Sequence, residues 1–127
     1  QYFGTYAERV VLAVLLENTE KKTVIDNFPQ ILKDLLAVYP NLSLKLSPKL
    51  ADQTQFTYIK TAQALNISAT IVDEAKAHSP YGLIVHSNHA ENLDKVLFSE
   101  LYPDILTPSE TEPILEKKGF FAKLFGK

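Results

Sequence analysis

Hydrophobic and polar residues alternate along the chain in patterns that predict four strands and three helices. Residues 9–16 read RVVLAVLL, which is apolar on both alternating faces and predicts a strand buried on both sides. Residues 42–47 read LSLKLS, and this strict alternation predicts a strand with one buried and one solvated face. Two further strands are predicted at residues 67–72 and 83–85.

The first helix is predicted between the first two strands, after a polar loop. Asn27 and Gln30 have the spacing of a helix N-cap and its reciprocal partner. Pro29 suits a first turn, and Pro40 ends the helix. The apolar positions recur at helical spacing and predict one buried face, made of Phe28, Ile31, Leu32, Leu35, Leu36 and Tyr39.

Two more helices are predicted further along the chain. Asp52 and Gln55 indicate the start of the second helix, and Asn66 suits its end because asparagine tolerates a left-handed backbone. The third helix is predicted over residues 91–102, with Pro103 as its stop. The buried side of the second helix is predicted to consist of Phe56, Ile59, Ala62 and Leu65.

The predicted order is β-α-β-α-β-β-α, with the last two strands forming a hairpin-like pair. This order indicates an α/β (α+β) fold in which helices pack against a mixed four-stranded sheet. We expect residues 1–106 to form a single domain. Residues 107–127 are expected to be a Pro-rich acidic linker followed by a basic amphipathic C-terminal tail.

Length and composition restrict the class of protein. The chain has 127 residues, 46% hydrophobic and 22% charged, which suits one globular domain and excludes a disordered chain. It has no cysteine, which excludes disulfides and thiolate metal sites and suits a reducing cytoplasm. The longest apolar stretch has seven residues, so no transmembrane segment is expected. Residue 1 is Gln and no Met is present, so we expect the chain to begin inside a longer gene product.

Charge is unevenly distributed. Residues 117–127 carry four lysines and no acid, whereas residues 1–116 carry 15 acids and 9 bases, a net charge of −6. Nucleic-acid binding depends on neutralising phosphates, so the acidic body argues against a general nucleic-acid surface.

Two segments carry a resemblance to a known family. Residues 3–10, FGTYAERV, run directly into the first strand, and residues 79–85, SPYGLIV, precede and form the last one. These segments and the order of elements resemble the YueI-like family of uncharacterised bacterial proteins over residues 2–98. The resemblance implies a compact α/β domain of chorismate-mutase-like arrangement in the cytoplasm, and it supplies no established activity.

Within the first of these segments, Thr5, Glu8 and Arg9 are candidates for an anion or partner site. Arginine can present a bidentate fork to a carboxylate or a phosphate. The alternative is structural: Gly4 permits a backbone turn, and Glu8 with Arg9 forms a partly solvated ion pair.

Catalytic and cofactor motifs are not found. The four glycines do not share a loop, so a phosphate-cradling loop is not expected, and no Gly-x-Ser-x-Gly is present. We therefore identify no catalytic residue and expect no cofactor. His86 and His89 have a spacing that could hold a metal ion, although residues just after a strand also serve to cap the next helix.

The C-terminal tail contains a cluster of apolar residues. Phe120, Phe121, Leu124 and Phe125 would span an arc of about 140° on a helix. These residues could pack against the body of the protein or against a second copy of it. They could instead bind weakly to an anionic membrane surface, or bind a protein partner.

These observations favour a non-enzymatic cytoplasmic binding or regulatory module that binds an unidentified protein partner or associates with itself. The first alternative is an RNA-binding protein, because residues 65–85 are loosely similar to the kink-turn-binding ribosomal proteins. Their glycine-rich RNA-contacting motif is absent from this chain. The second alternative is a small-molecule enzyme with a site between subunits.

Overall fold

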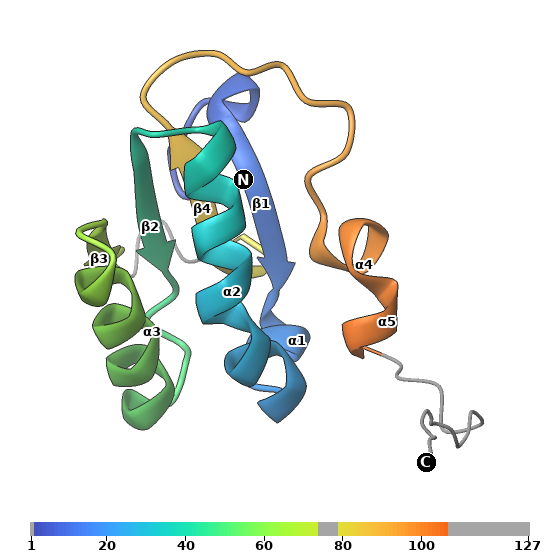
Figure 1. Cartoon of the computed structure of the whole chain (residues 1–127). Coiled ribbons are helices and arrows are strands. Elements are labelled where there is room, and N and C mark those ends of the chain that lie inside the picture. The colour runs from blue at the N-terminus through green and yellow to red at the C-terminus, as the bar shows by residue number, and fades with distance from the viewer. Residues whose placement is uncertain (1, 74–78, 107–127) are drawn as a thin grey trace.

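A four-stranded mixed sheet forms the centre of the molecule in this computed structural model, with strand order β1-β4-β2-β3 (Figure 1). The structure describes residues 2–73 and 79–106. Strand β4 runs antiparallel to β1 and to β2, while β3 runs parallel to β2. The predicted α+β fold with a mixed four-stranded sheet is confirmed. The strands are β1 (Val10–Leu15), β2 (Leu42–Leu46), β3 (Ser68–Ile71) and β4 (Tyr81–Ser87).

The prediction that the last two strands form a hairpin-like pair is wrong. Val85 of β4 lies opposite Leu12 of β1 on one side and Leu44 of β2 on the other, whereas β3 pairs only with β2. The reason is burial. Six of the seven residues of β4 are buried, which suits a strand in the middle of the sheet. Three of the four residues of β3 are exposed, which suits an edge strand.

Two long helices, α2 and α3, lie side by side against one face of the sheet, and two short helices, α4 and α5, lie beside β1 (Figure 1). Phe28 and Leu32 of α2 and Tyr58 of α3 are fully buried there, and the rings of Phe28 and Tyr58 meet edge to face at 5.0 Å. The helices are α1 (Leu16–Thr19), α2 (Lys22–Val38), α3 (Asp52–Ala64), α4 (Phe98–Leu101) and α5 (Pro103–Leu106), with a 3₁₀ turn η1 (Ala7–Arg9) before β1.

Helix α2 begins at Lys22, so the predicted start at Asn27 is wrong. The side-chain amide of Asn27 donates to the carbonyl of Thr23 within the helix, at 2.7 Å, and caps nothing. Pro29 therefore lies in the helix interior, where it removes a main-chain hydrogen bond. Val24 is fully buried one turn before Phe28, and burial of this earlier turn offsets the cost of the proline.

Helix α3 lies where it was predicted, but its N-cap is Ala51 rather than Asp52, and its buried face differs from the prediction. Phe56 is 55% exposed, whereas Tyr58 is 1% exposed. Thr54, Tyr58 and Ala62 recur every four residues and define the buried stripe, so Phe56 points away from it. Asn66 ends the helix in a left-handed conformation (φ 60°), as predicted.

The predicted third helix over residues 91–102 is also wrong. Only α4, with four residues, falls inside that range, and Pro103 begins α5 rather than closing a long helix. The chain before α4 is extended along β1 instead. The N–H of Ala13 donates to the carbonyl of Val96 at 2.8 Å, and Ala13 bridges Leu97 in parallel. This contact supplies hydrogen-bond partners to the outer edge of a buried strand, which a helix could not do.

The second face of the sheet, opposite α2 and α3, has its own apolar cluster. Its buried members are Phe3, Val10, Ala13, Val72, Tyr81 and Ile84. Tyr2 stacks on Tyr81 with ring centroids 5.1 Å apart. Among the described residues, this cluster is covered by the N-terminal segment and not by α2 or α3.

Candidate functional site

Polar side chains of β2 and β4 gather on the second face of the sheet. Lys45 of β2 lies opposite Ile84 of β4, and His86 lies opposite both Val10 and Ser43. Residues paired across strands share a face, and Val10 and Ile84 belong to the second apolar cluster. Lys45 and His86 therefore stand on the face that α2 and α3 do not cover.

A tight turn brings Thr5 to this face. Phe3 and Gly4 both have left-handed backbones (φ 56° and 80°), and the N–H of Thr5 donates to the carbonyl of Tyr2 at 2.9 Å. Gly4 adopts that conformation without steric cost. The hydroxyl of Thr5 then accepts a hydrogen bond from Nζ of Lys45 at 2.8 Å.

Arg9 is the single arginine of the sequence, and it ends η1 just before β1. Its guanidinium lies 5.2 Å from the centre of the Tyr6 ring, a cation–π distance. Arg9 immediately precedes Val10, which lies opposite His86 in the sheet, so Arg9 is close to the end of the same face. We call Thr5, Arg9, Lys45 and His86 the sheet-face cluster.

Glu8, the third predicted residue of this segment, contacts the chain after β4 through its main chain. Its side chain is exposed, and its main-chain carbonyl accepts hydrogen bonds from the N–H groups of Glu91 and Asn92 at 2.7 and 3.0 Å. This contact fixes the segment after β4 to the start of β1. Glu8 thus has a connecting role in the described structure.

The surroundings of His86 lower the pKa of its ring. Burial lowers its pKa first, and the positive charges of Lys45 and Arg9 lower the pKa further, against the opposing effect of the hydrogen bond to Ser87. Nδ1 lies 3.1 Å from the carbonyl of Ser87, so Nδ1 carries the proton of the neutral ring. Nε2 is buried and has no hydrogen-bond partner among the described residues. The cluster thus contains a neutral imidazole whose Nε2 is buried without a partner among the described residues, and this ring does not line the hollow described below.

The hydroxyl of Thr5, the ammonium of Lys45 and the guanidinium of Arg9 give this face hydrogen-bond donors and positive charge. A hollow of about 320 Å³ lies beside Lys45, between Phe3 and the end of β3, and Asp73 also lines it. Such donors suit a carboxylate or a phosphate. The sequence predicted Thr5 and Arg9 but missed Lys45, although the alternation of LSLKLS had already placed that residue on the more solvated face.

The metal candidates His86 and His89 face different partners. Nδ1 of His89 lies 2.7 Å from the amide oxygen of Asn88, and its Nε2 lies 3.1 Å from the carboxylate of Glu91. Within residues 2–73 and 79–106, no three His, Asp or Glu side chains converge on a point that could hold a metal ion. The arrangement of the described side chains therefore offers no metal-ligand set.

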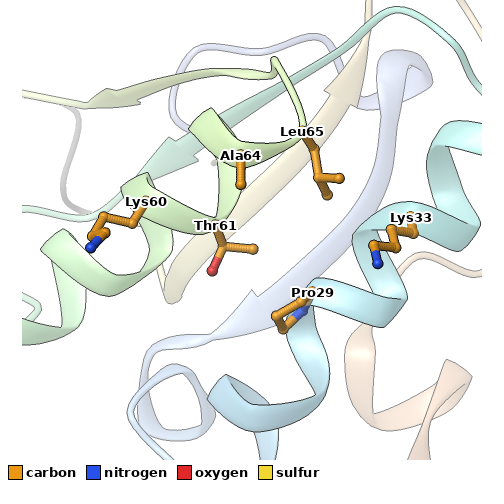
Figure 2. A pocket seen from close by; sticks show the side chains of 6 residues that line it. All are labelled: Pro29, Lys33, Lys60, Thr61, Ala64 and Leu65. Carbon is orange, nitrogen blue, oxygen red and sulfur yellow. The ribbon is translucent and has the colours of Figure 1, made fainter.

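A second hollow lies between the two long helices, on the other side of the molecule. Figure 2 shows its lining side chains, which come from α2 and α3 and surround a groove of about 370 Å³. Neither Lys33 nor Lys60 forms an ion pair with any described residue. We call this the α2–α3 groove, lined by Pro29, Lys33, Lys60, Thr61, Ala64 and Leu65.

The predicted docking residues Phe120, Phe121, Leu124 and Phe125 lie outside the described residues. None of the helices in the described part of the chain has the length and hydrophobicity needed to cross a membrane.

Comparisons with known proteins agree with the resemblance seen in the sequence. Residues 1–97 match the model of a family described as "Protein of unknown function (DUF1694)". The fold is similar to the crystal structure of the YueI protein from Bacillus subtilis, with a TM-score of 0.65 and 24% identity over 76% of this chain and 72% of that one. No curated protein sequence matches the chain significantly. The predicted YueI-like resemblance is confirmed.

Proposed function

The chain belongs to the DUF1694 family of proteins of unknown function, and we propose that it is a cytoplasmic, non-enzymatic binding module that holds an anionic group at the sheet-face cluster. The observation that carries this proposal is the contact of Thr5 with Lys45 beside a neutral His86. The cluster is positively charged within a body whose net charge is −6. A carboxylate or phosphate is the ligand chemistry that fits it.

Binding of an anion is coupled to proton uptake in this arrangement. A ligand anion counters the positive charges of Lys45 and Arg9, which now lower the pKa of His86. The pKa of His86 then rises, so the ring takes up a proton more readily in the complex than in the free protein.

Asp73 should weaken the binding of an anion at this site. It lines the hollow beside Lys45, and its negative charge repels an anion placed there. Removing the charge of Asp73 should therefore strengthen anion binding, whereas removing the charge of Lys45 should weaken it.

The experiment uses inorganic phosphate and succinate as probes, titrated by calorimetry at pH 6 and pH 7.5. We expect tighter binding at pH 6, at least tenfold weaker binding in Lys45→Met, and tighter binding in Asp73→Asn. Lys49→Met removes an exposed lysine four residues further along and is the matched control, which should bind as the native chain does. Absence of binding, or equal loss in both lysine variants, would overturn the site.

Two alternatives from the sequence predict other results. An RNA-binding protein should retain structured RNA on a filter, with an affinity that falls steeply as salt rises. If a small molecule copurifies with the protein, an enzyme should convert it into a product, whereas a binding module should release it chemically unchanged. Mass spectrometry of the released molecule, before and after incubation with fresh protein, distinguishes these two outcomes.

A further inference from the structure

A second apolar groove lies on the other flank of α2, towards α4. It measures about 370 Å³, and we call it the α2–α4 groove. Two of its lining side chains are strongly or partly exposed: Val38 at 65% and Leu101 at 37%. Its apolar lining includes Val11, Leu35, Val38, Leu93, Leu101 and Tyr102.

The described chain ends in α5, which begins directly after Tyr102 of this groove's lining. Ile105 and Leu106 of α5 pack against the helix-side core, and α5 contacts α2 (Figure 1). Phe120 follows Leu106 by fourteen positions, and an extended chain of fourteen residues spans at most about 46–50 Å. Helix α2, with 17 residues, is only about 26 Å long. The tail can therefore reach both grooves that flank α2, and reach alone does not select between them.

Charge distinguishes the two grooves. Lys33 and Lys60 line the α2–α3 groove, and no carboxylate is among its lining residues (Figure 2). The α2–α4 groove contains Asp34, whose carboxylate raises the pKa of Tyr102 in addition to the effect of burial, and it also contains Lys95. Residues 117–127 carry four lysines and no acid, so Lys33 and Lys60 repel them from the α2–α3 groove, whereas Asp34 balances Lys95 in the α2–α4 groove and leaves no net repulsion there.

We propose that Phe120, Phe121, Leu124 and Phe125 dock into the α2–α4 groove of their own chain. Burial of these side chains against Val38 and Leu101 supplies the driving force, because apolar surface on both partners leaves water. The lysines of the tail orient it towards Asp34 and away from the α2–α3 groove. The occupied groove would cover the exposed apolar surface beside α4.

The absence of cysteine from the chain allows a direct test by disulfide trapping. Val38→Cys with Ala122→Cys places one thiol in the α2–α4 groove and the other in the tail, and it preserves all four apolar tail residues. Ala64→Cys with Ala122→Cys is the matched control, because Ala64 is an exposed residue of the α2–α3 groove. Both full-length variants are checked for folding by circular dichroism and oxidised in a glutathione buffer.

We expect the intramolecular disulfide of the first pair to form at least tenfold faster than that of the control, as read on non-reducing gels and by mass spectrometry. Adding Phe121→Ser and Phe125→Ser should reduce the first rate to that of the control. Equal rates in the two pairs, or no effect of the serine changes, would overturn the proposal. A disulfide formed only between two chains, or equal rates together with sedimentation on anionic vesicles, would overturn it in favour of a second copy or a membrane surface.

Discussion

The hydroxyl of Tyr58 donates a hydrogen bond of 2.6 Å to the main-chain carbonyl of Thr19, which lies 39 residues earlier in the chain. Both residues are buried, and the bond connects α3 to the end of α1. Burial and the nearby negative charge of Glu20 raise the pKa of Tyr58, so the phenol keeps its proton throughout the physiological range. Thr19 also faces Gly82 of β4, so one residue links two helices and a strand.

We expect Tyr58→Phe to lower the free energy of unfolding by about 1–3 kcal/mol, because it leaves the carbonyl of Thr19 buried without its donor. Urea denaturation followed by circular dichroism measures the change. Tyr6→Phe is the control. Because Tyr6 is 62% exposed, this variant should unfold as the native chain does. Equal stability of the two variants would contradict this role for the hydroxyl.

Gly82→Ala should destabilise the protein by about 1–3 kcal/mol through overpacking. A Cβ atom at position 82 would lie 2.3 Å from Oγ1 of Thr19 and 3.2 Å from Cα of Leu16. The thermal unfolding midpoint of Gly82→Ala, Thr19→Ala and the double variant measures the clash. The cost of Gly82→Ala should be smaller in the Thr19→Ala background, and strictly additive effects would argue against direct contact.

His86 should make stability depend on pH between neutral and mildly acidic conditions. Because its pKa is lowered in the folded state, the unfolded chain binds the proton first as pH falls below the usual value of about 6.5. Stability is therefore complete above that pH and decreases below it. Urea midpoints from pH 8 to pH 5 should fall less steeply in His86→Asn, and parallel curves for the two proteins would contradict the prediction.

Glu20 should stabilise the start of α3 from outside that helix. Its carboxylate accepts the N–H of Ala51 at 2.9 Å and the hydroxyl of Thr54, and these two bonds lower its pKa. Its stabilising effect is present above the usual glutamate pKa and is lost as pH falls through the lowered value. Glu20→Gln should cost at most about 1 kcal/mol at pH 7, because the group is largely exposed, and it should cost less near pH 3. Guanidinium denaturation at both pH values, with Glu17→Gln as an exposed control, measures this difference.

The strands were predictable because their patterns report burial directly. The alternation of residues 42–46 and the all-apolar run of residues 10–15 each match the burial found in β2 and β1, whereas Ser47, predicted on the solvated face, is buried. Helix boundaries were less predictable, since they depend on contacts distant in sequence. Nothing near Asp52 indicates that Glu20 satisfies the first turn of α3, and Pro29 gives no sign that buried Val24 extends α2 towards the N-terminus.

The candidate site likewise combines residues that local sequence reveals with residues that only the folded structure brings together. Arg9 and Thr5 lie in one short motif and could be found by inspection, whereas Lys45 and His86 join them only through strand pairing. The hydrogen bond from Lys45 to Thr5 spans 40 residues. The sequence also could not show that β4 lies between β1 and β2, which is what places His86 beside Ser43.

The strand order has a consequence for synthesis on the ribosome. Strand β1 and the parallel pair of β2 and β3 make no mutual pairing, and β4, the last of the described strands to be translated, joins them. The nascent chain therefore exposes the apolar segment Val10–Leu15 until Tyr81–Ser87 has left the exit tunnel, some 70 residues later. Long-range pairings of this kind slow folding, so closure of the sheet by its last strand sets the time during which the chain depends on protection from aggregation.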